Sequence, residues 1–416
     1  MLLIFIVVIF QALITFIIKN FIIINDIYSL LLVAILFFTV SVYLLKNYSG
    51  KWIFLIYIGF CLRIVILLID IYVPFIPIFG SGADTEYFHT ASLKIANGEM
   101  SLSEGRTFYV TLLSGFYYFF GDQRILAQFL NIVLWIFSAI YLLKTLRIFN
   151  VNETLIFWSL VIFTFAPNLM FMTSILLRES IIIFFLMLSL YNFFTWMNKK
   201  NFLSFLFAII FILFSMLFHA GMIGVLLSYL VILIFLQSKK GIKNKKLYLF
   251  FFIIIFLFLL LNDDLFLSKF LSLQEDGVEN LDVTNSGGSA YLQSFNHLNG
   301  WLVFLLTPLK MIFFLFSPLP FNWRGMSDLI SFGFDSVIYI FLAIMILTYI
   351  KKSSLEKKVK VSLVILLFIS IFVFSYGTGN AGTAMRHRTK LIPLFIVAWA
   401  MLSHRTYSKR NKKTSL

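Results

Sequence analysis

The sequence predicts an all-α, polytopic integral membrane protein with about 12 transmembrane helices, plus re-entrant or surface helices on its outer side. Hydrophobic residues make up 61% of the 416 residues and charged residues 12%. A soluble domain carries about half apolar and about a quarter charged residues. The net charge of +15 comes from basic residues at the ends of apolar runs, a pattern that orients membrane proteins. We therefore expect membrane lipid as a partner and no nucleic acid.

Apolar stretches that suit a spanning helix recur along the whole chain. We expect spans at residues 2–18, 28–45, 52–72, 125–146, 154–172, 180–196, 202–218, 222–236, 247–261, 329–350, 361–375 and 386–403. The first stretch lacks a basic start and a small-residue cleavage site, so it is expected to stay as a helix. The stretches 108–120 and 301–316 are expected not to cross, because the first is short and the second contains Pro308 and Lys310.

Lys and Arg in the short loops set the predicted orientation. Basic residues fall in alternate loops, which places both termini in the cytoplasm. The chain is expected to form one transmembrane domain over residues 1–416. Within it we expect two accessory helices in 1–50, a core in 51–200, and outer loops at 73–124 and 262–328.

Asp84 and Tyr87 stand at the beginning of the first predicted outer loop, in the segment SGADTEYFHTASLKIANGE. A carboxylate at a membrane boundary can act as a general base or bind a divalent metal. The alternative is an acid in the first turn of a helix, where it favours the helix dipole. We predict Asp84 as catalytic and Tyr87 as substrate-binding, and we predict neither a metal site nor a cofactor.

Arg178 and Glu179 occupy a predicted outer turn, in SILLRESIII. Adjacent residues of a helix do not face each other, so the two charges are expected to have different partners. Glu179 is predicted as a second candidate for the catalytic base and Arg178 as substrate-binding. The alternative is a snorkelling arginine beside a helix-start acid.

Arg386, His387 and Arg388 form a basic cluster on the predicted outer side, against the positive-inside tendency. Arginine forks fit phosphate oxygens, so Arg386 and Arg388 are predicted to bind a diphosphate, and His387 is predicted as substrate-binding. Contact with lipid headgroups or protein acids is the alternative. Two arginines two positions apart point about 200° from each other on a regular helix, so we expect an irregular segment here. Arg324, in SPLPFNWRG, is also predicted as substrate-binding.

The order of features from Trp52 to Trp196 resembles the membrane glycosyltransferases of the GT-C superfamily. The matching residues are Asp84 at the start of the first outer loop, then Tyr87, Ala91, Gly98, the stretch 108–120, Gly121 and Asn131. The resemblance implies that Asp84 corresponds to the functional acid of that superfamily. It also implies a polyprenyl-linked sugar as donor.

The whole chain resembles an O-antigen or capsule polymerase of lipopolysaccharide or capsule biosynthesis, in its size, its Phe- and Ile-rich spans and its arginine-bearing outer loops. This resemblance implies polymerisation of undecaprenyl-diphosphate-linked repeat units on the outer face of the membrane. Its expected partners are polyprenyl-linked glycan donor and acceptor, with a flippase and a chain-length regulator of the same pathway. Two alternatives stay open: a GT-C enzyme that transfers a single sugar from a polyprenyl monophosphate, and a flippase or transporter of lipid-linked oligosaccharides.

Overall fold

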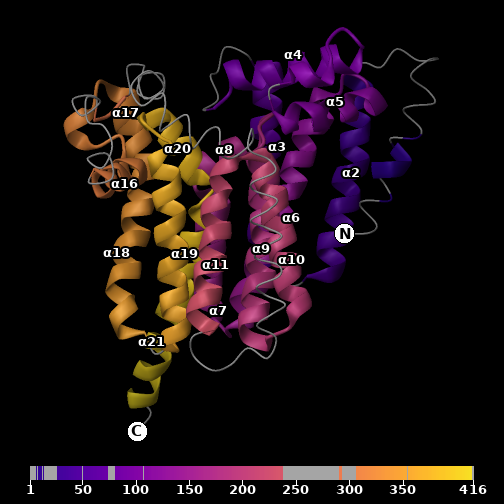
Figure 1. Cartoon of the computed structure of the whole chain (residues 1–416). Coiled ribbons are helices and arrows are strands. Elements are labelled where there is room, and N and C mark those ends of the chain that lie inside the picture. Colours follow the sequence, from indigo (N-terminus) through magenta and orange to yellow (C-terminus); the bar gives the residue numbers. More distant parts are fainter. Residues whose placement is uncertain are drawn as a thin grey trace. The chain divides into compact units, whose positions relative to one another are not determined.

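The chain is helical along nearly all of its described length (Figure 1). The computed structural model describes residues 26–48, 50–73, 80–105, 107–237, 290–292, 306–353 and 355–414, with a few residues before position 14. These parts contain 16 α-helices and one isolated β-bridge, between Ala290 and Asn380, so the predicted all-α class is confirmed. The predicted spans 2–18 and 247–261 and most of the predicted loop 262–328 lie outside the described residues.

Six helical segments of the described part are long and apolar enough to cross a bilayer. They are α2 (Asp26–Asn47), α3 (Lys51–Tyr72), α6 (Arg124–Ile148), α9 (Glu179–Lys199), α19 (Lys357–Tyr376) and a continuous run of α17 (Met326–Ser331), a π turn (Phe332–Ser336) and α18 (Val337–Lys352). Several membrane-length apolar helices in one chain indicate an integral membrane protein. The described residues do not show twelve spans.

Shorter apolar helices lie between these segments. They are α5 (Phe108–Phe120), α7 (Glu153–Phe165), α10 (Phe202–Phe218), α11 (Ile223–Gln237), α16 (Thr307–Phe316) and the apolar part of α21 (Ile392–Thr414). At 13 and 10 residues, α5 and α16 are about 20 and 15 Å long, short of the ~30 Å hydrocarbon core. The length of α5 agrees with the expectation that the stretch 108–120 does not cross the membrane, whereas residues 301–305 of the other stretch lie outside the described residues.

Two predicted spans are each divided into two helices. The predicted span 154–172 consists of α7 and α8 (Pro167–Met172), because Pro167 has no N–H to continue the ladder of α7. The predicted span 386–403 likewise consists of α20 (Ala381–Thr389) and α21, which carries Pro393 in its first turn. In both places the single-helix prediction was wrong.

The first predicted outer loop folds into a helical pair, α4 (Ala83–Ala96) packed on α5 (Figure 1). Gly98 follows α4 at φ +78° and Gly121 ends α5 at φ +73°, left-handed conformations that favour glycine. Ser92 of α4 also donates a hydrogen bond to the carbonyl of Val110 in α5 (3.1 Å). These contacts join the two elements that carry the GT-C-like residue pattern.

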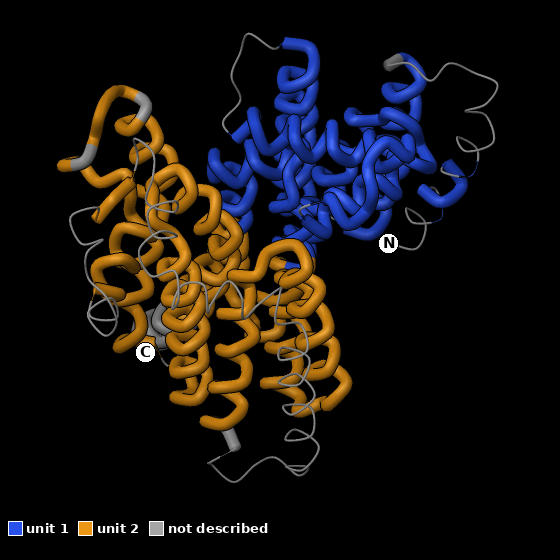
Figure 2. The backbone as a smooth tube through the Cα atoms, turned by 45° about the horizontal axis from the view of Figure 1, so that its top comes forward, with its two compact units in different colours: residues 1–141, 160–184 blue, residues 142–159, 185–416 orange. Residues whose placement is uncertain are grey.

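The chain divides into two compact units, coloured blue and orange in Figure 2. Unit 1 contains residues 1–141 and 160–184, and unit 2 contains residues 142–159 and 185–416. The division falls within α6, α7 and α9, which therefore contribute to both units. Each unit is described below by itself.

Unit 2 brings two predicted cytoplasmic turns together. Burial and the nearby charge of Lys358 lower the pKa of Lys200, so the turn before α10 lies close to the start of α19. Elsewhere in this unit α11 crosses α19 closely at Gly224, where an added Cβ would lie 3.1 Å from the Cα of Ser370. Because Gly224 has no side chain, α11 and α19 can approach this closely, and a larger residue would push the two helices apart.

Candidate functional site

Asp84 and Tyr87 lie on the first turns of α4, in unit 1. Asp84 is exposed and follows the N-cap Gly82 by two positions, the place where an acid interacts favourably with the helix dipole. Tyr87 is half-buried, and its ring centroid lies 5.9 Å from that of Phe88. The observed geometry fits the helix-start alternative for Asp84 and is equally open to a catalytic role at an exposed position.

A network of charges that the sequence analysis missed connects α4 to the longer helices of unit 1. Arg124 donates to Glu86 of α4 at 2.8 Å and lies 3.7 Å from the buried carboxylate of Asp70 in α3. Gln128, one turn further along α6, donates to the same carboxylate at 2.9 Å. The partners of Asp70 are thus both on α6. The partners come from separate stretches of chain, so no local sequence pattern could have indicated them.

His89 lies next to this network, on the side of α4 that faces α5. Its Nδ1 lies 2.9 Å from the hydroxyl of Tyr117, and its Nε2 lies 3.8 Å from the carboxylate of Asp122. Burial is the largest influence on the ring and lowers the pKa of His89 below its ordinary value. The ring is therefore neutral at pH 7, and its contact with Asp122 is not a full ion pair.

Residues 175–178 contact two helices of unit 1, α6 and α4. The side-chain amide of Asn131, in α6, donates to the carbonyls of Ile175 and Leu177, both at 2.9 Å. The guanidinium of Arg178 lies 6.0 Å from the ring centroid of Phe88 in α4. The structure thus brings one predicted site residue, Arg178, beside the helix that carries Asp84 and Tyr87.

Glu179 is fully buried at the first position of α9. Glu179 and Arg178 both interact electrostatically with the buried hydroxyl group of Tyr109 in α5. A buried carboxylate needs hydrogen bonds or a counter-charge, so Glu179 belongs to this polar cluster rather than to the solvated surface.

A cavity of about 560 Å³ lies along the helices of unit 1. Tyr109 and Asn131 are its polar lining residues, and the other lining side chains of α5, α6 and α9 are aliphatic or aromatic. On α6 the lining runs from Ala127 to Phe137, a length of about 15 Å. The cavity is therefore an elongated apolar space with a polar group at its side, within the ~300–1,000 Å³ range of ligand sites.

Arg63 is a fully buried cation in the middle of α3. It donates to the Thr173 hydroxyl at 2.9 Å and to the carbonyls of Gly59 and Thr164, both at 3.1 Å. Its guanidinium carbon lies 3.5 Å from the ring centroid of Trp135. Among the described residues no carboxylate lies within ion-pair distance of Arg63, so backbone carbonyls, a hydroxyl and a cation–π contact stabilise its charge.

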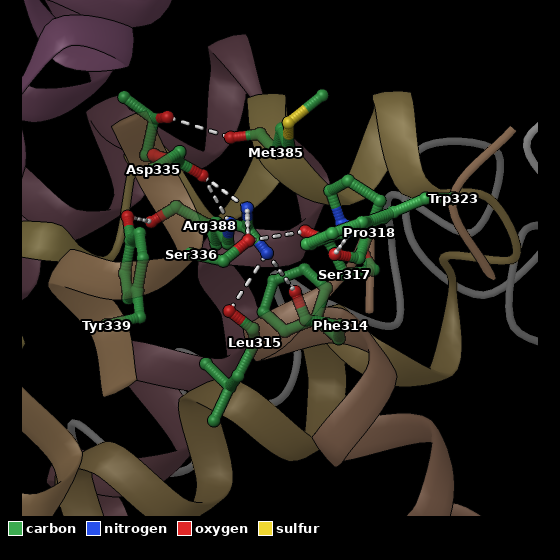
Figure 3. Close-up of polar contacts among 11 residues, drawn as sticks. Phe314, Leu315, Ser317, Pro318, Trp323, Asp335, Ser336, Tyr339, Met385 and Arg388 are labelled. Carbon is green, nitrogen blue, oxygen red and sulfur yellow. Dashed lines mark hydrogen bonds and ion pairs between the residues drawn. The ribbon is translucent and has the colours of Figure 1, made fainter. Parts of the chain in front are cut away.

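Arg388 is the buried centre of a polar cluster in unit 2 (Figure 3). Its Nε donates to the carboxylate of Asp335 at 2.6 Å. Its Nη2 also contacts this carboxylate, and it donates to the hydroxyl of Ser336 at 3.0 Å. Its Nη1 donates to the carbonyls of Phe314 (3.3 Å) and Leu315 (2.8 Å). These contacts use all five N–H groups of a guanidinium. In this conformation Arg388 has no N–H left for a diphosphate.

The π turn explains how Asp335 and Ser336 both reach Arg388. Successive residues of an α-helix point about 100° apart, and the wider turn at Phe332–Ser336 changes this spacing locally. Ser336 in turn donates to the carbonyl of Ser317 at 2.9 Å, and the Tyr339 hydroxyl donates to the carbonyl of Arg388 at 2.8 Å (Figure 3). One arginine therefore joins α16, α18 and α20.

The segment that carries Arg386, His387 and Arg388 is a regular helix, α20, and the expected irregular conformation was wrong. Asn380 explains the difference, because its side chain accepts a hydrogen bond from Thr383 N–H at 2.8 Å and caps the helix. The two arginines therefore point in different directions. Arg388 is fully buried, whereas Arg386 and His387 are half-buried.

His387 lies against a second histidine, His219. His219 ends α10, and its ring centroid lies 4.6 Å from that of His387 in an edge-to-face arrangement. Both rings contact Phe374 of α19, at 5.2 and 6.0 Å. The two histidines are separated by more than 160 positions, so sequence spacing carried no sign of the pair.

Arg324 is part of a local ion pair. Its guanidinium donates twice to the carboxylate of Asp328, both times at 2.8 Å, and its side chain is 49% exposed. The predicted site residues thus fall into two groups. Asp84, Tyr87, Arg178 and Glu179 belong to unit 1, and Arg324, Arg386, His387 and Arg388 belong to unit 2.

No protein-family model, curated protein or solved structure matches this chain. The geometry of its own residues therefore carries the functional argument.

Proposed function

We propose that the chain is a membrane glycosyltransferase of the polysaccharide polymerase type. It polymerises undecaprenyl-diphosphate-linked repeat units on the outer face of a bacterial cytoplasmic membrane, in the assembly of O-antigen, capsule or a related surface polysaccharide. The donor is a growing glycan chain on its lipid diphosphate. The acceptor is a sugar hydroxyl of the next lipid-linked repeat unit, delivered by a flippase, and a chain-length regulator acts on the product.

The observation that carries this proposal is the elongated apolar cavity of unit 1 with its polar side. A space of about 560 Å³ lined by apolar side chains suits a hydrocarbon chain better than a sugar, which needs hydrogen-bonding groups along its whole length. Tyr109 and Asn131 mark where a polar headgroup would begin. Arg178 interacts electrostatically with Tyr109, and its planar fork can bind an anionic headgroup.

The transfer reaction needs a cation where negative charge develops on the departing diphosphate. Arg386 and Arg388 in α20 are the cations predicted for this role; Arg386 is half-buried, and Arg388 donates to Asp335, Ser336 and backbone carbonyls. The reaction also needs an acceptor for the hydroxyl proton. Asp84 and Glu179 are the acidic candidates in unit 1.

Two observations favour the flippase alternative. Arg63 is a charge in the middle of a membrane-length helix, and α7 is interrupted at Pro167 near its contact with Arg63. Buried charges beside broken helices occur in transporters. The contacts of Arg63 with backbone carbonyls also explain it as a structural group, so the polymerase is the preferred proposal.

The test is to analyse the surface glycan and the lipid-linked repeat units of a strain that lacks this gene. Loss of a polymerase leaves single repeat units at the surface, whereas loss of a flippase leaves lipid-linked units inside the membrane and none outside. Loss of a transferase for a single sugar changes the composition of the repeat unit instead. A surface polymer of unchanged amount, length and composition would contradict all three.

A further inference from the structure

We propose that unit 2 binds one anionic phospholipid, with its headgroup between the α9–α10 turn and the α18–α19 turn and an acyl chain along α10. The site is separate from glycosyl transfer, so the inference goes beyond the proposed function and does not depend on it. The class of ligand follows from the charge of the two turns and from the apolar surface that begins beside them.

The two turns are strongly basic and lie at the ends of membrane-length helices. The helix α9 ends at Lys199, the run that contains α18 ends at Lys352, and α19 begins at Lys357. The segments 199–201 and 351–360 contain one acid, Glu356, and seven lysines: Lys199, Lys200, Lys351, Lys352, Lys357, Lys358 and Lys360. Each of these lysines except Lys360 is exposed. They therefore stand at the level of lipid headgroups, on the side that is predicted to be cytoplasmic.

Lys200 and Lys358 bring the two turns together. Their positive charges repel each other, and this repulsion adds to burial in lowering the pKa of Lys200. Glu356 offsets part of the charge through its contact with Lys358 at 2.6 Å, but ion pairs as exposed as this one contribute little. A phosphate group between the turns would replace repulsion by attraction to both lysines.

Local contacts give both turns a defined shape. The Nζ of Lys200 lies 5.1 Å from the ring centroid of the buried Trp196, one turn back on α9. The Nζ of Lys360 donates to the carbonyl of Ser353 at 3.2 Å, across the α18–α19 turn. The lysines are thus presented from ordered backbone, and a tryptophan lies beside them, as is common at membrane interfaces.

An apolar stripe on α10 begins within one turn of Lys200. Leu203, Phe207 and Phe214 are 57%, 46% and 44% exposed. At about 100° and 1.5 Å per residue, the three side chains lie within about 40° of one another around the helix and span about 16 Å along it. This length is about half of the ~30 Å hydrocarbon core, which is the depth of one leaflet.

The combination of lysines and stripe favours a phospholipid over an acidic protein. An acidic protein would use the lysines alone, and its contacts would end at the turns. A phospholipid uses both, because its headgroup is anionic and its acyl chain extends through one leaflet. Basic pockets between membrane helices on the cytoplasmic side bind anionic headgroups, and the lysine ammonium binds phosphate as a point charge.

The experiment is photolabelling of the purified protein in phosphatidylcholine vesicles. The vesicles contain a trace of phosphatidylglycerol or phosphatidylcholine with a diazirine on the acyl chain, and mass spectrometry locates the labelled residues. Each lysine near an anionic headgroup favours binding by about fivefold, so phosphatidylglycerol should label residues 203–214 about tenfold or more above phosphatidylcholine. Salt at about 1 M should remove most of this preference, because it shortens the screening length to about 3 Å.

Two double variants test the two turns separately. Lys199→Gln/Lys200→Gln and Lys357→Gln/Lys358→Gln should each lower the preference for phosphatidylglycerol at least about fivefold. The second variant is the sharper test, because its residues are more than 140 positions from α10 in sequence. Lys357→Arg/Lys358→Arg keeps the charge and should keep the preference, and size-exclusion profiles show that each variant is folded.

The matched control is Lys46→Gln/Lys51→Gln, which removes two lysines from the α2–α3 turn and should leave the labelling of α10 unchanged. Equal labelling of residues 203–214 by the two lipids would overturn the lipid site and assign the lysines to an acidic partner protein. A preference that survives Lys357→Gln/Lys358→Gln in a folded protein would overturn the headgroup position between the two turns.

Discussion

The buried pair of Arg388 and Asp335 should be the most sensitive electrostatic contact in the described part of unit 2. The carboxylate of Asp335 is only 7% exposed, and Arg388→Met would remove its cation. The same substitution would leave the carbonyls of Phe314 and Leu315 without their donor. Breaking one side of a buried pair costs about 3–5 kcal/mol. Arg388→Lys supplies a charge but not the planar fork, and should cost about 1–3 kcal/mol for the acceptors it leaves unpaired.

The double variant Arg388→Met/Asp335→Leu removes both charges at once. It should recover most of the lost stability, because replacing a buried pair by apolar groups is often neutral or stabilising. The expected coupling energy is therefore about 3 kcal/mol. Its measurement is unfolding of purified protein in mixed detergent micelles, followed by tryptophan fluorescence.

The pair of Arg324 and Asp328 is the matched control, because it has the same charges at an exposed position, with Arg324 49% exposed. The double-mutant cycle of this exposed pair should give a coupling energy of less than about 1 kcal/mol. A loss below ~1 kcal/mol for Arg388→Met would refute the structural account of the buried pair. Activity of the folded double variant decides the role of Arg388: retained activity supports positioning of α20, and lost activity supports the predicted contact with substrate.

Three further predictions concern separate parts of the chain. Arg63→Lys should lower the unfolding free energy by about 1–3 kcal/mol, because an ammonium cannot reach all the acceptors of the guanidinium; an unchanged value contradicts this. Gly224→Ala should destabilise by about 1–3 kcal/mol, whereas Gly115→Ala, with open space around it, should be neutral or stabilising; equal effects contradict the close helix contact. In a cysteine-free background, an impermeant thiol reagent should label Ser103→Cys in spheroplasts but not Asn201→Cys, and the reverse pattern would invert the topology.

Hydropathy and helix-end signals predicted most of the helices of the described part. The boundaries of α10 agree with the predicted stretch 202–218, because Asn201 caps its start and His219 ends it. The break at Pro167 was missed because apolar composition continues across it. A proline inside an apolar stretch was the signal that could have located it.

Side-chain partners were much less predictable than helices. The sequence indicated Arg388 as a buried cation that needs an anion, but its partner Asp335 is 53 positions away and reaches it through a π turn. The same limit applies to Arg124 and to the pairing of His219 with His387, since helix packing alone brings these residues together. Single-residue chemistry could be predicted, whereas the identity of the partners required the fold.

The central claim is that this protein joins lipid-linked repeat units by itself. Its most direct measurement is incubation of the purified chain in proteoliposomes with an undecaprenyl-diphosphate-linked repeat unit, followed by separation of the products by length. The account predicts a ladder of glycans on lipid diphosphate, with one undecaprenyl diphosphate released for each bond formed. Unchanged single repeat units after incubation with folded protein would contradict it.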